Sequence, residues 1–285
     1  VHYMDAHTPY VPAPRYIREV SSTLFGTHRM LHAHLRTGLG WDVDERTLGE
    51  LRTLYAAAVR QVDASIGRLR EALEANGLAE DTAIILAGDH GEEFQEHGHL
   101  AHYPKLYDEL IRVPFIVDVP GAPPRCVDPQ VSLASIPATV AELLGVDPHP
   151  DWVGQSLAST ATTGEPPVDE PVVSVTVRGE EVTSQPIPRS LSDGELLVSV
   201  RDRDWIYIEN VDADERELYY RPSDPTQQTD LSADPTADQQ AVIDQFSDRV
   251  EEHVATTLTG GDADESTADT VDEDLDARLE ALGYK

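Results

Sequence analysis

The chain has 285 residues, and its 53 acidic against 21 basic side chains give a formal net charge of -32. Nucleic acid is therefore a poor partner, because its phosphates would meet a repulsive field, and no apolar run approaches the roughly 18 residues of a membrane span. The one cysteine, Cys126, excludes an internal disulfide and reads as an idle loop thiol. Only Lys105 and Lys285 are lysines, a balance typical of halophile proteins, for which molar salt shortens the screening length to about 3 Å.

The first half of the chain predicts helices alternating with strands. Residues 1–7 read as a short strand that gives way to a loop at Pro9, so that His7 lies where strand becomes loop. Apolar residues recur every three or four positions over 51–75, which predicts a long amphipathic helix. The continuous apolar run of "DTAIILAG", 81–88, then predicts a fully buried strand of the parallel type.

The same alternation continues up to a linker. A short helix and a strand at 113–117 are expected in "KLYDELIRVPFIVDVPG", and a second amphipathic helix in 131–146. Helix, tight loop and buried strand together indicate an α/β sheet, in which ligands gather at the carboxyl ends of strands. Residues 158–170 are rich in Thr, Ser, Pro and Gly and read as a linker.

Beyond the linker the pattern changes to shorter strands. "PVVSVTV", "ELLVSV" and "DWIYIEN" are strand-like, the last two flanking a hairpin turn; "ELYY" predicts an edge strand, and "ADQQAVIDQFSDRVEEHV" a closing helix. The expected organisation is an α/β core in 1–160, a small C-terminal α+β subdomain in 171–255, and an acidic tail with a terminal helix in 256–285.

Carboxylates and histidines gather directly after the predicted buried strand, in "LAGDHGEEFQEHGHLAH". Asp89 and His90 are the residue types that hold a metal ion at a strand end, where a turn can aim both at one ion. On spacing alone this tetrapeptide is a weak metal signal, and a capping Asp89 beside a hydrogen-bonded His90 accounts for it as well.

The remaining polar residues of this segment carry a weaker signal. The three histidines that follow are too loosely spaced for a zinc motif, and each alone is more often a surface or core residue; they are His97, His99 and His102. In so acidic a chain, Glu92, Glu93 and Glu96 are expected to face solvent.

Taken in order, several segments resemble the carboxyl-terminal part of the sulfatase branch of the alkaline phosphatase superfamily. They are "HYMDAHTPYVP", "VDASIGRLREALEANGLAEDTAIILAGDHGEE", "LYDELIRVPFIV", "SIPATVAELLGVDPHPDWVGQSL", "ELYYRPSDPTQQTDLSADP" and "LEALGY". The resemblance covers nearly the whole chain. It implies an alkaline-phosphatase-like mixed or parallel sheet flanked by helices, followed by a small subdomain of antiparallel strands and a helix.

The resemblance also implies roles for single residues. Asp89 and His90 would be metal ligands, and His7 would contact the transferred oxyanion or the leaving group. A further substrate histidine would be His102, with His99 as the second choice. Lys105 would bind the oxyanion or be a plain surface residue, because its spacing to the next helix is shorter than the usual pattern.

Sulfatase relatives use a divalent ion, and the resemblance implies Ca²⁺ for a sulfatase or Mn²⁺ or Zn²⁺ for a phospho-type enzyme. In the family, two acidic ligands and the nucleophile of a "C/S-x-P-x-R" turn precede everything that matches. We therefore expect a fragment whose other half-site lies outside the chain, and Cys126 in "RCVD" does not substitute.

The expected activity is that of a metal-dependent sulfatase acting on sulfate esters of saccharides or small molecules. One alternative is a phosphodiesterase, phosphonate hydrolase or phosphoethanolamine-type transferase of the same superfamily. Another is a non-catalytic remnant that serves as a binding module and binds no divalent metal.

Overall fold

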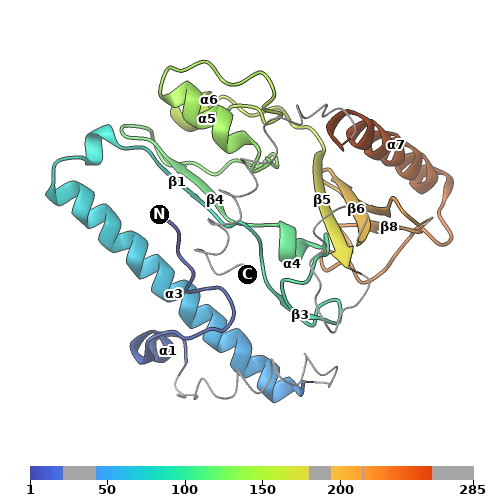
Figure 1. Ribbon diagram of the computed structural model, residues 1–285, viewed down its shortest axis with the longest axis horizontal. Coiled ribbons are helices and arrows are strands. Elements are labelled where there is room, and N and C mark those ends of the chain that lie inside the picture. The colour runs from blue at the N-terminus through green and yellow to red at the C-terminus, as the bar shows by residue number, and fades with distance from the viewer. Residues whose placement is uncertain (22–42, 180–193, 214, 259–285) are drawn as a thin grey trace, which may run out of the picture.

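The computed structural model describes residues 1–21, 43–179, 194–213 and 215–258. Figure 1 shows the long helix α3 (Glu45–Ala75) running beside a short sheet, and a separate sheet covered by α7 (Ala237–His253). None of the described helices is long and apolar enough to cross a membrane. The predicted tail of 256–285 lies outside the described residues beyond position 258.

Helix α3 confirms the predicted amphipathic helix and begins six residues earlier than expected. The carboxylate of Asp44 accepts a hydrogen bond from the Thr47 N–H in the first turn. This N-terminal cap lets the helix begin in the polar stretch before residue 51. Gly77, at φ +67°, follows its end. The short helix α1 (Pro14–Val20) packs against α3 in a shared apolar core that includes Tyr10.

The strand predicted in 81–88 is β1 (Ile84–Ala87), and it pairs with β4 (Phe115–Asp118). The pairing is antiparallel, from Ile84 opposite Asp118 to Ala87 opposite Phe115, and β1 is only half-buried. The prediction of a fully buried parallel strand is thus wrong for this pair. An apolar run predicts that side chains are buried, but it does not predict whether the neighbouring strand is parallel or antiparallel. In the described part of the chain this sheet has two strands.

Residues 1–13 contain no strand, so the strand predicted at 1–7 is also wrong. The segment is instead a turn in which the His7 N–H donates to the Met4 carbonyl at 3.1 Å. A short strand exists only where a neighbour completes its ladder, and among the described residues none pairs with this segment.

The second amphipathic helix is α5 (Ser135–Leu143), packed against α6 (Ala158–Thr162). The hydroxyl of Thr139 in α5 accepts from the Leu157 N–H at 2.9 Å and so ties the start of α6 to α5. The predicted linker of 158–170 is therefore helical over its first five residues.

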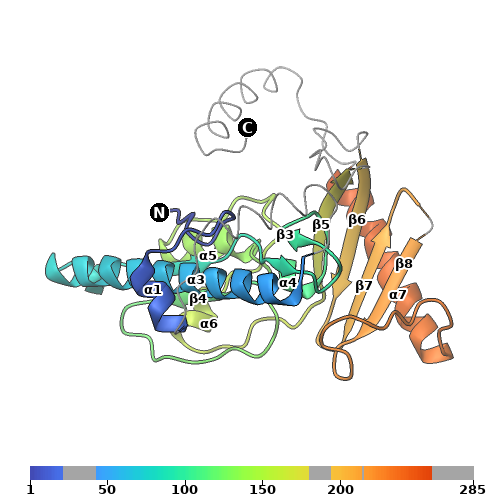
Figure 2. The same cartoon turned by 90° about the horizontal axis from the view of Figure 1, so that it is seen from below.

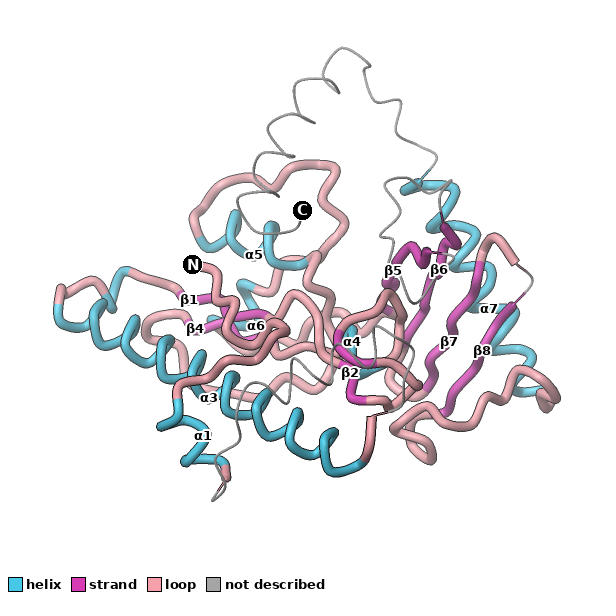
Figure 3. The backbone as a smooth tube through the Cα atoms, turned by 60° about the horizontal axis from the view of Figure 1, so that its bottom comes forward, coloured by secondary structure: helices cyan, strands magenta, loops and turns pink. Residues whose placement is uncertain are grey.

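The C-terminal sheet is antiparallel, and its strand order follows the chain: β5 (Val172–Gly179), β6 (Gly194–Arg201), β7 (Trp205–Asn210) and β8 (Glu215–Tyr220). Figures 2 and 3 show α7 lying along one face of it. That face buries Val198, Tyr207 and Leu218 against Phe246 of α7. The strands, the hairpin between β6 and β7 and the closing helix are as predicted.

The opposite face of the C-terminal sheet is buried as well. Ile206, Ile208 and Tyr219 pack there against Leu106 and its neighbour Tyr107, just before α4 (Asp108–Ile111). Alternation along the strands supplies apolar side chains to both faces. The sheet therefore packs against the segment that directly follows the carboxylates and histidines of residues 89–102.

Tyr207 makes the stability of this sheet sensitive to alkali. Its hydroxyl donates to Glu209 at 2.6 Å, and burial, with a contribution from Glu209, raises the pKa of the phenol. The contribution of Tyr207 to the free energy of unfolding is complete below the ordinary phenol pKa of about 10. It falls as pH rises above this value, because only the unfolded chain then loses the phenol proton. From pH 10 upward this one residue should reduce the free energy of unfolding by about 1.4 kcal/mol per pH unit.

We expect Tyr207→Phe to flatten this decline, measured by denaturant unfolding at several pH values at constant salt. The neighbouring Phe246→Leu is the control, because it weakens the same core without removing an ionisable group. It should lower the free energy of unfolding about equally at every pH. Equal alkaline slopes for Tyr207→Phe and the wild type would contradict the assignment.

Candidate functional site

Three histidines from three separate segments come together beside the end of β1. The ring centroid of His102 lies 4.9 Å from that of His7 and 4.5 Å from that of His90. We call His7, His90 and His102 the histidine cluster. Of the two candidates for the further substrate histidine, His102 is the one that contacts both other rings, whereas His99 stacks on Tyr103 at 4.8 Å.

All three rings of the histidine cluster present the same nitrogen to an oxygen. Nδ1 of His7 lies 2.5 Å from the Thr8 carbonyl, and Nδ1 of His90 lies 2.8 Å from the Gly91 carbonyl. Nδ1 of His102 lies 3.1 Å from a carboxylate oxygen of Glu92. Carbonyl and ionised carboxylate oxygens only accept, so Nδ1 carries the hydrogen in each ring and a neutral ring has its lone pair on Nε2.

Asp89 and His90 are both exposed at the end of β1. One carboxylate oxygen of Asp89 accepts from the His90 N–H at 3.0 Å, which is the local capping bond that the sequence allowed. The imidazole Nε2 of His90 and the second Asp89 oxygen remain suitable donors for a divalent ion. Within the described residues no group of three or more His, Cys, Asp and Glu side chains is arranged to hold a metal.

The loop that carries this pair is fixed by the backbone of α4. The Gly91 N–H donates to the Leu110 carbonyl at 2.7 Å, and the Glu92 N–H donates to the Glu109 carbonyl at 2.9 Å. A Cβ atom on residue 91 would lie 1.9 Å from the Glu109 carbonyl oxygen. Glycine is therefore required at position 91 for α4 to approach this closely.

Two of the carboxylates expected to face solvent are buried, and that prediction is wrong for them. Glu92 is 8% exposed and Glu93 0%, while Glu96 is partly exposed. Glu92 accepts a hydrogen bond from the phenol of Tyr10 and contacts His102. The overall acidity of the chain suggested surface carboxylates, and only the apolar Phe94 that follows hinted at a buried strand here.

Glu93 holds the loop between the short strands β2 (Glu93–Phe94) and β3 (Leu100–Ala101). One of its oxygens accepts from the N–H groups of His97 and His99, at 2.9 and 2.8 Å. The other lies 3.3 Å from the ammonium of Lys105, which also donates to the His97 carbonyl at 2.6 Å. Burial lowers the pKa of Lys105, and the charge of Glu93 opposes this shift.

Lys105 is thus directed into the interior of the loop, 10% exposed, rather than left as a plain surface residue. Its predicted contact with an oxyanion, like that of His99, stays a prediction. The Nδ1 of His99 lies 3.3 Å from the His97 carbonyl, in the same loop.

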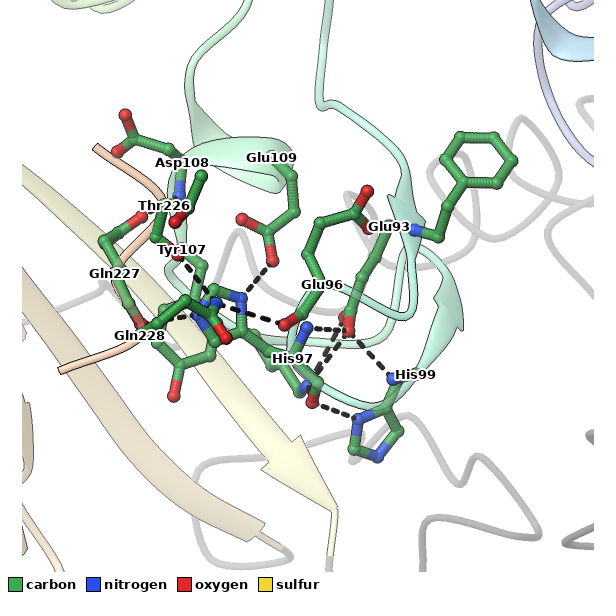
Figure 4. Close-up of polar contacts among 12 residues, drawn as sticks. Glu93, Glu96, His97, His99, Tyr107, Asp108, Glu109, Thr226, Gln227 and Gln228 are labelled. Carbon is green, nitrogen blue, oxygen red and sulfur yellow. Dashed lines mark hydrogen bonds and ion pairs between the residues drawn. The ribbon is translucent and has the colours of Figure 1, made fainter. Parts of the chain in front are cut away.

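His97 connects this loop to the C-terminal part of the chain (Figure 4). Its ring stacks on Tyr107, with centroids 3.6 Å apart. Nδ1 lies 2.5 Å from a carboxylate oxygen of Glu109, and Nε2 lies 2.9 Å from the Gln227 carbonyl. The side chain of Gln227 in turn accepts from the Asp108 N–H at 2.8 Å. His97 therefore belongs to a packed junction and not to the histidine cluster.

We expect Lys105→Met to lower the free energy of unfolding by about 3–5 kcal/mol, because it leaves the fully buried carboxylate of Glu93 without its cation. The double variant Lys105→Met/Glu93→Gln should recover part of this loss, since an amide oxygen can still accept from the two backbone N–H groups. Denaturant titration of both variants measures the effect.

Arg70→Met is the matched control for this experiment. The Arg70–Asp118 pair is 3.6 Å apart and its side chains are more than half exposed, so its loss should change stability by less than about 0.5 kcal/mol. A similarly small change for Lys105→Met would show that the ammonium does not hold the loop.

Comparison with known proteins identifies the family of the chain. The sulfatase family model matches residues 1–146. The choline-sulfatase of Rhizobium meliloti (strain 1021) is 26% identical over 212 residues, which are 73% of this chain and 38% of the relative. Human iduronate 2-sulfatase is 40% identical over 72 residues, covering 25% of this chain and 13% of the relative.

Solved structures give the same fold. The phosphonate monoester hydrolase of Agrobacterium radiobacter has a TM-score of 0.63 and 25% identity, covering 75% of this chain and 43% of its own. The putative sulfatase yidJ from Bacteroides fragilis, at 20% identity, has a TM-score of 0.67 over 88% of this chain and 52% of its own. The chain spans about half or less of the length of these proteins. It has an α/β fold and belongs to the sulfatase family of the alkaline phosphatase superfamily.

Proposed function

We propose that the chain supplies the metal-binding and oxyanion-contacting part of a hydrolase that cleaves sulfate esters of saccharides or small molecules. The observation that carries the proposal is the histidine cluster, in which three imidazoles with Nδ1 bound to oxygen meet beside the exposed carboxylate of Asp89. Membership of the sulfatase family supports the same reading.

In this proposal Asp89 and His90 bind one divalent ion. The donor set fits, because the Gly91 carbonyl fixes the His90 ring with its Nε2 lone pair available, as in histidines that ligate metals. Ca²⁺ is the proposed ion for a sulfatase, and Mn²⁺ or Zn²⁺ for phospho-type chemistry. The bound ion would neutralise charge that develops on the oxyanion.

His7 and His102 are the proposed contacts to the transferred group. In its protonated form each ring can donate through Nε2 to an oxyanion or leaving-group oxygen, while Nδ1 keeps its bond to the protein. Lys105 supports these histidines by holding the 93–102 loop. A direct contact of Lys105 or His99 with the oxyanion is a further part of the proposal. The proposed nucleophile and further acidic ligands belong to a segment outside this sequence.

Phosphonate monoester or phosphodiester hydrolysis is the second candidate function. The similarity of the fold to that of a phosphonate monoester hydrolase favours it. His90 favours it too, because some members of the family that the chain resembles have an asparagine at this position. A phosphoethanolamine-type transferase would use the same oxyanion contacts. A non-catalytic remnant would keep the fold but bind no divalent metal.

Metal binding provides the first test and needs no substrate. Calorimetric titration of the chain with Ca²⁺, Mn²⁺ and Zn²⁺ should detect one site, and His90→Ala should weaken it by at least about tenfold. His149→Ala is the control, since His149 is 60% exposed and contacts Asp151 and Trp152. Equal affinities for the two variants, or no binding to the wild type, would favour the remnant.

Activity provides the second test. The chain and the full gene product that contains it should be assayed in molar salt against aryl and saccharide sulfates, a phosphonate monoester and a phosphodiester. Sulfate hydrolysis that is lost in His7→Ala and His102→Ala is the expected result, and a preference for the phosphorus esters would select the second candidate. Translation of the DNA upstream of the Val1 codon should reveal a "C-x-P-x-R" turn or its Ser or Thr form.

A further inference from the structure

Glu92 joins the three segments that build the histidine cluster. It follows Asp89 and His90 on the same loop, it accepts a hydrogen bond from Tyr10, three residues after His7, and it contacts Nδ1 of His102 at 3.1 Å. Its side chain is 3% exposed, whereas that of His102 is 30% exposed. A buried carboxylate thus faces Nδ1 of a ring that is itself partly exposed.

This placement of a carboxylate has an energetic cost that suggests a purpose. A buried carboxylate loses several kcal/mol of hydration and is retained where hydrogen bonds and a partner offset that loss. The lysine of this region, Lys105, pairs with Glu93, and the basic side chain that contacts Glu92 is His102. Its second polar contact, the phenol of Tyr10, is 2% exposed and fixes the direction of the carboxylate.

The contact between Glu92 and His102 also determines which nitrogen of His102 carries hydrogen. Because an ionised carboxylate only accepts, it selects the Nδ1–H form and leaves the lone pair on Nε2. Backbone carbonyls impose the same form on His7 and His90. Only His102 depends on a side chain for it, and a side chain can be replaced.

We propose that Glu92, held by Tyr10, is a positioning residue that orients His102 and keeps its hydrogen on Nδ1, so that Nε2, which donates in the protonated ring, is the nitrogen left for the oxyanion or leaving-group oxygen. The inference deepens the proposed function, because the role of His102 toward substrate rests on it. Glu92 itself touches no substrate in this arrangement. Carboxylates that orient metal-binding histidines contribute about 10- to 100-fold to affinity or activity, and we expect a contribution of the same order for His102.

The test is a long-range ¹H–¹⁵N correlation spectrum of the chain labelled with ¹⁵N-histidine, recorded about two units above the ordinary imidazole pKa of about 6.5. His102→Gln identifies the His102 signals by their loss. In the wild type, Nε2 of His102 should have the shift of an unprotonated nitrogen and Nδ1 that of a protonated one. A dominant Nε2–H form in the wild type would overturn the proposal without any variant.

Glu92→Gln gives the second readout. Its amide can turn its NH₂ group toward Nδ1, so the Nε2–H form of His102 should become populated. Glu92→Asp should restore the wild-type form at least in part, and Tyr10→Phe should keep it, since the carboxylate remains. The matched control is Glu96→Gln, because Glu96 contacts Arg52 and lies in the same loop. An unchanged His102 spectrum in Glu92→Gln would overturn the proposal.

The outcome is separable from that of the proposed function. If the gene product hydrolyses sulfate or phosphorus esters, Glu92→Gln should lower kcat by about 10- to 100-fold, and Glu92→Asp should recover part of this loss. A gene product that hydrolyses none of them contradicts the proposed function. The spectrum of the wild-type chain still decides whether Glu92 fixes His102.

Discussion

The structure around the site depends on two adjacent buried carboxylates that act in opposite directions. Glu92 faces Tyr10 and the histidine cluster, whereas Glu93 faces Lys105 and the backbone of the 97–99 loop. Neighbouring residues on an extended backbone point to opposite sides, so a single short stretch can serve both. Each carboxylate would be costly alone, and the partners that compensate for it are also the groups that must be held in place.

The C-terminal sheet contributes to this arrangement although it carries none of the site residues. Its inner face packs on Leu106 and Tyr107, and Arg201 pairs with Asp108 at 2.5 Å. These contacts fix α4, whose backbone carbonyls receive the N–H groups of Gly91 and Glu92. The loop of Asp89 and His90 is therefore held in place, through α4, by a sheet that begins more than 80 residues later in the chain. Sites held on rigid elements in this way keep their geometry more precisely.

The sequence predicted the elements whose signals are local and periodic, and much of the rest depends on partners. The period of α3 and the apolar runs of β6 and β7 follow from their own residues. The direction of β1 relative to β4 does not, because an apolar run is compatible with either pairing. The family resemblance singled out the histidines as site residues. It could not show that Glu92 and Glu93 are buried, because their burial depends on contacts with segments distant in the sequence.

Lys105 has a practical consequence through its scarcity. The sequence contains one other lysine, Lys285, so a reagent that modifies primary amines has few targets in this protein. The Lys105 amine is nearly enclosed and engaged by Glu93 and the His97 carbonyl. Its modification requires the 93–105 segment to open, and the rate of that modification would report local breathing at the edge of the site, without an introduced label.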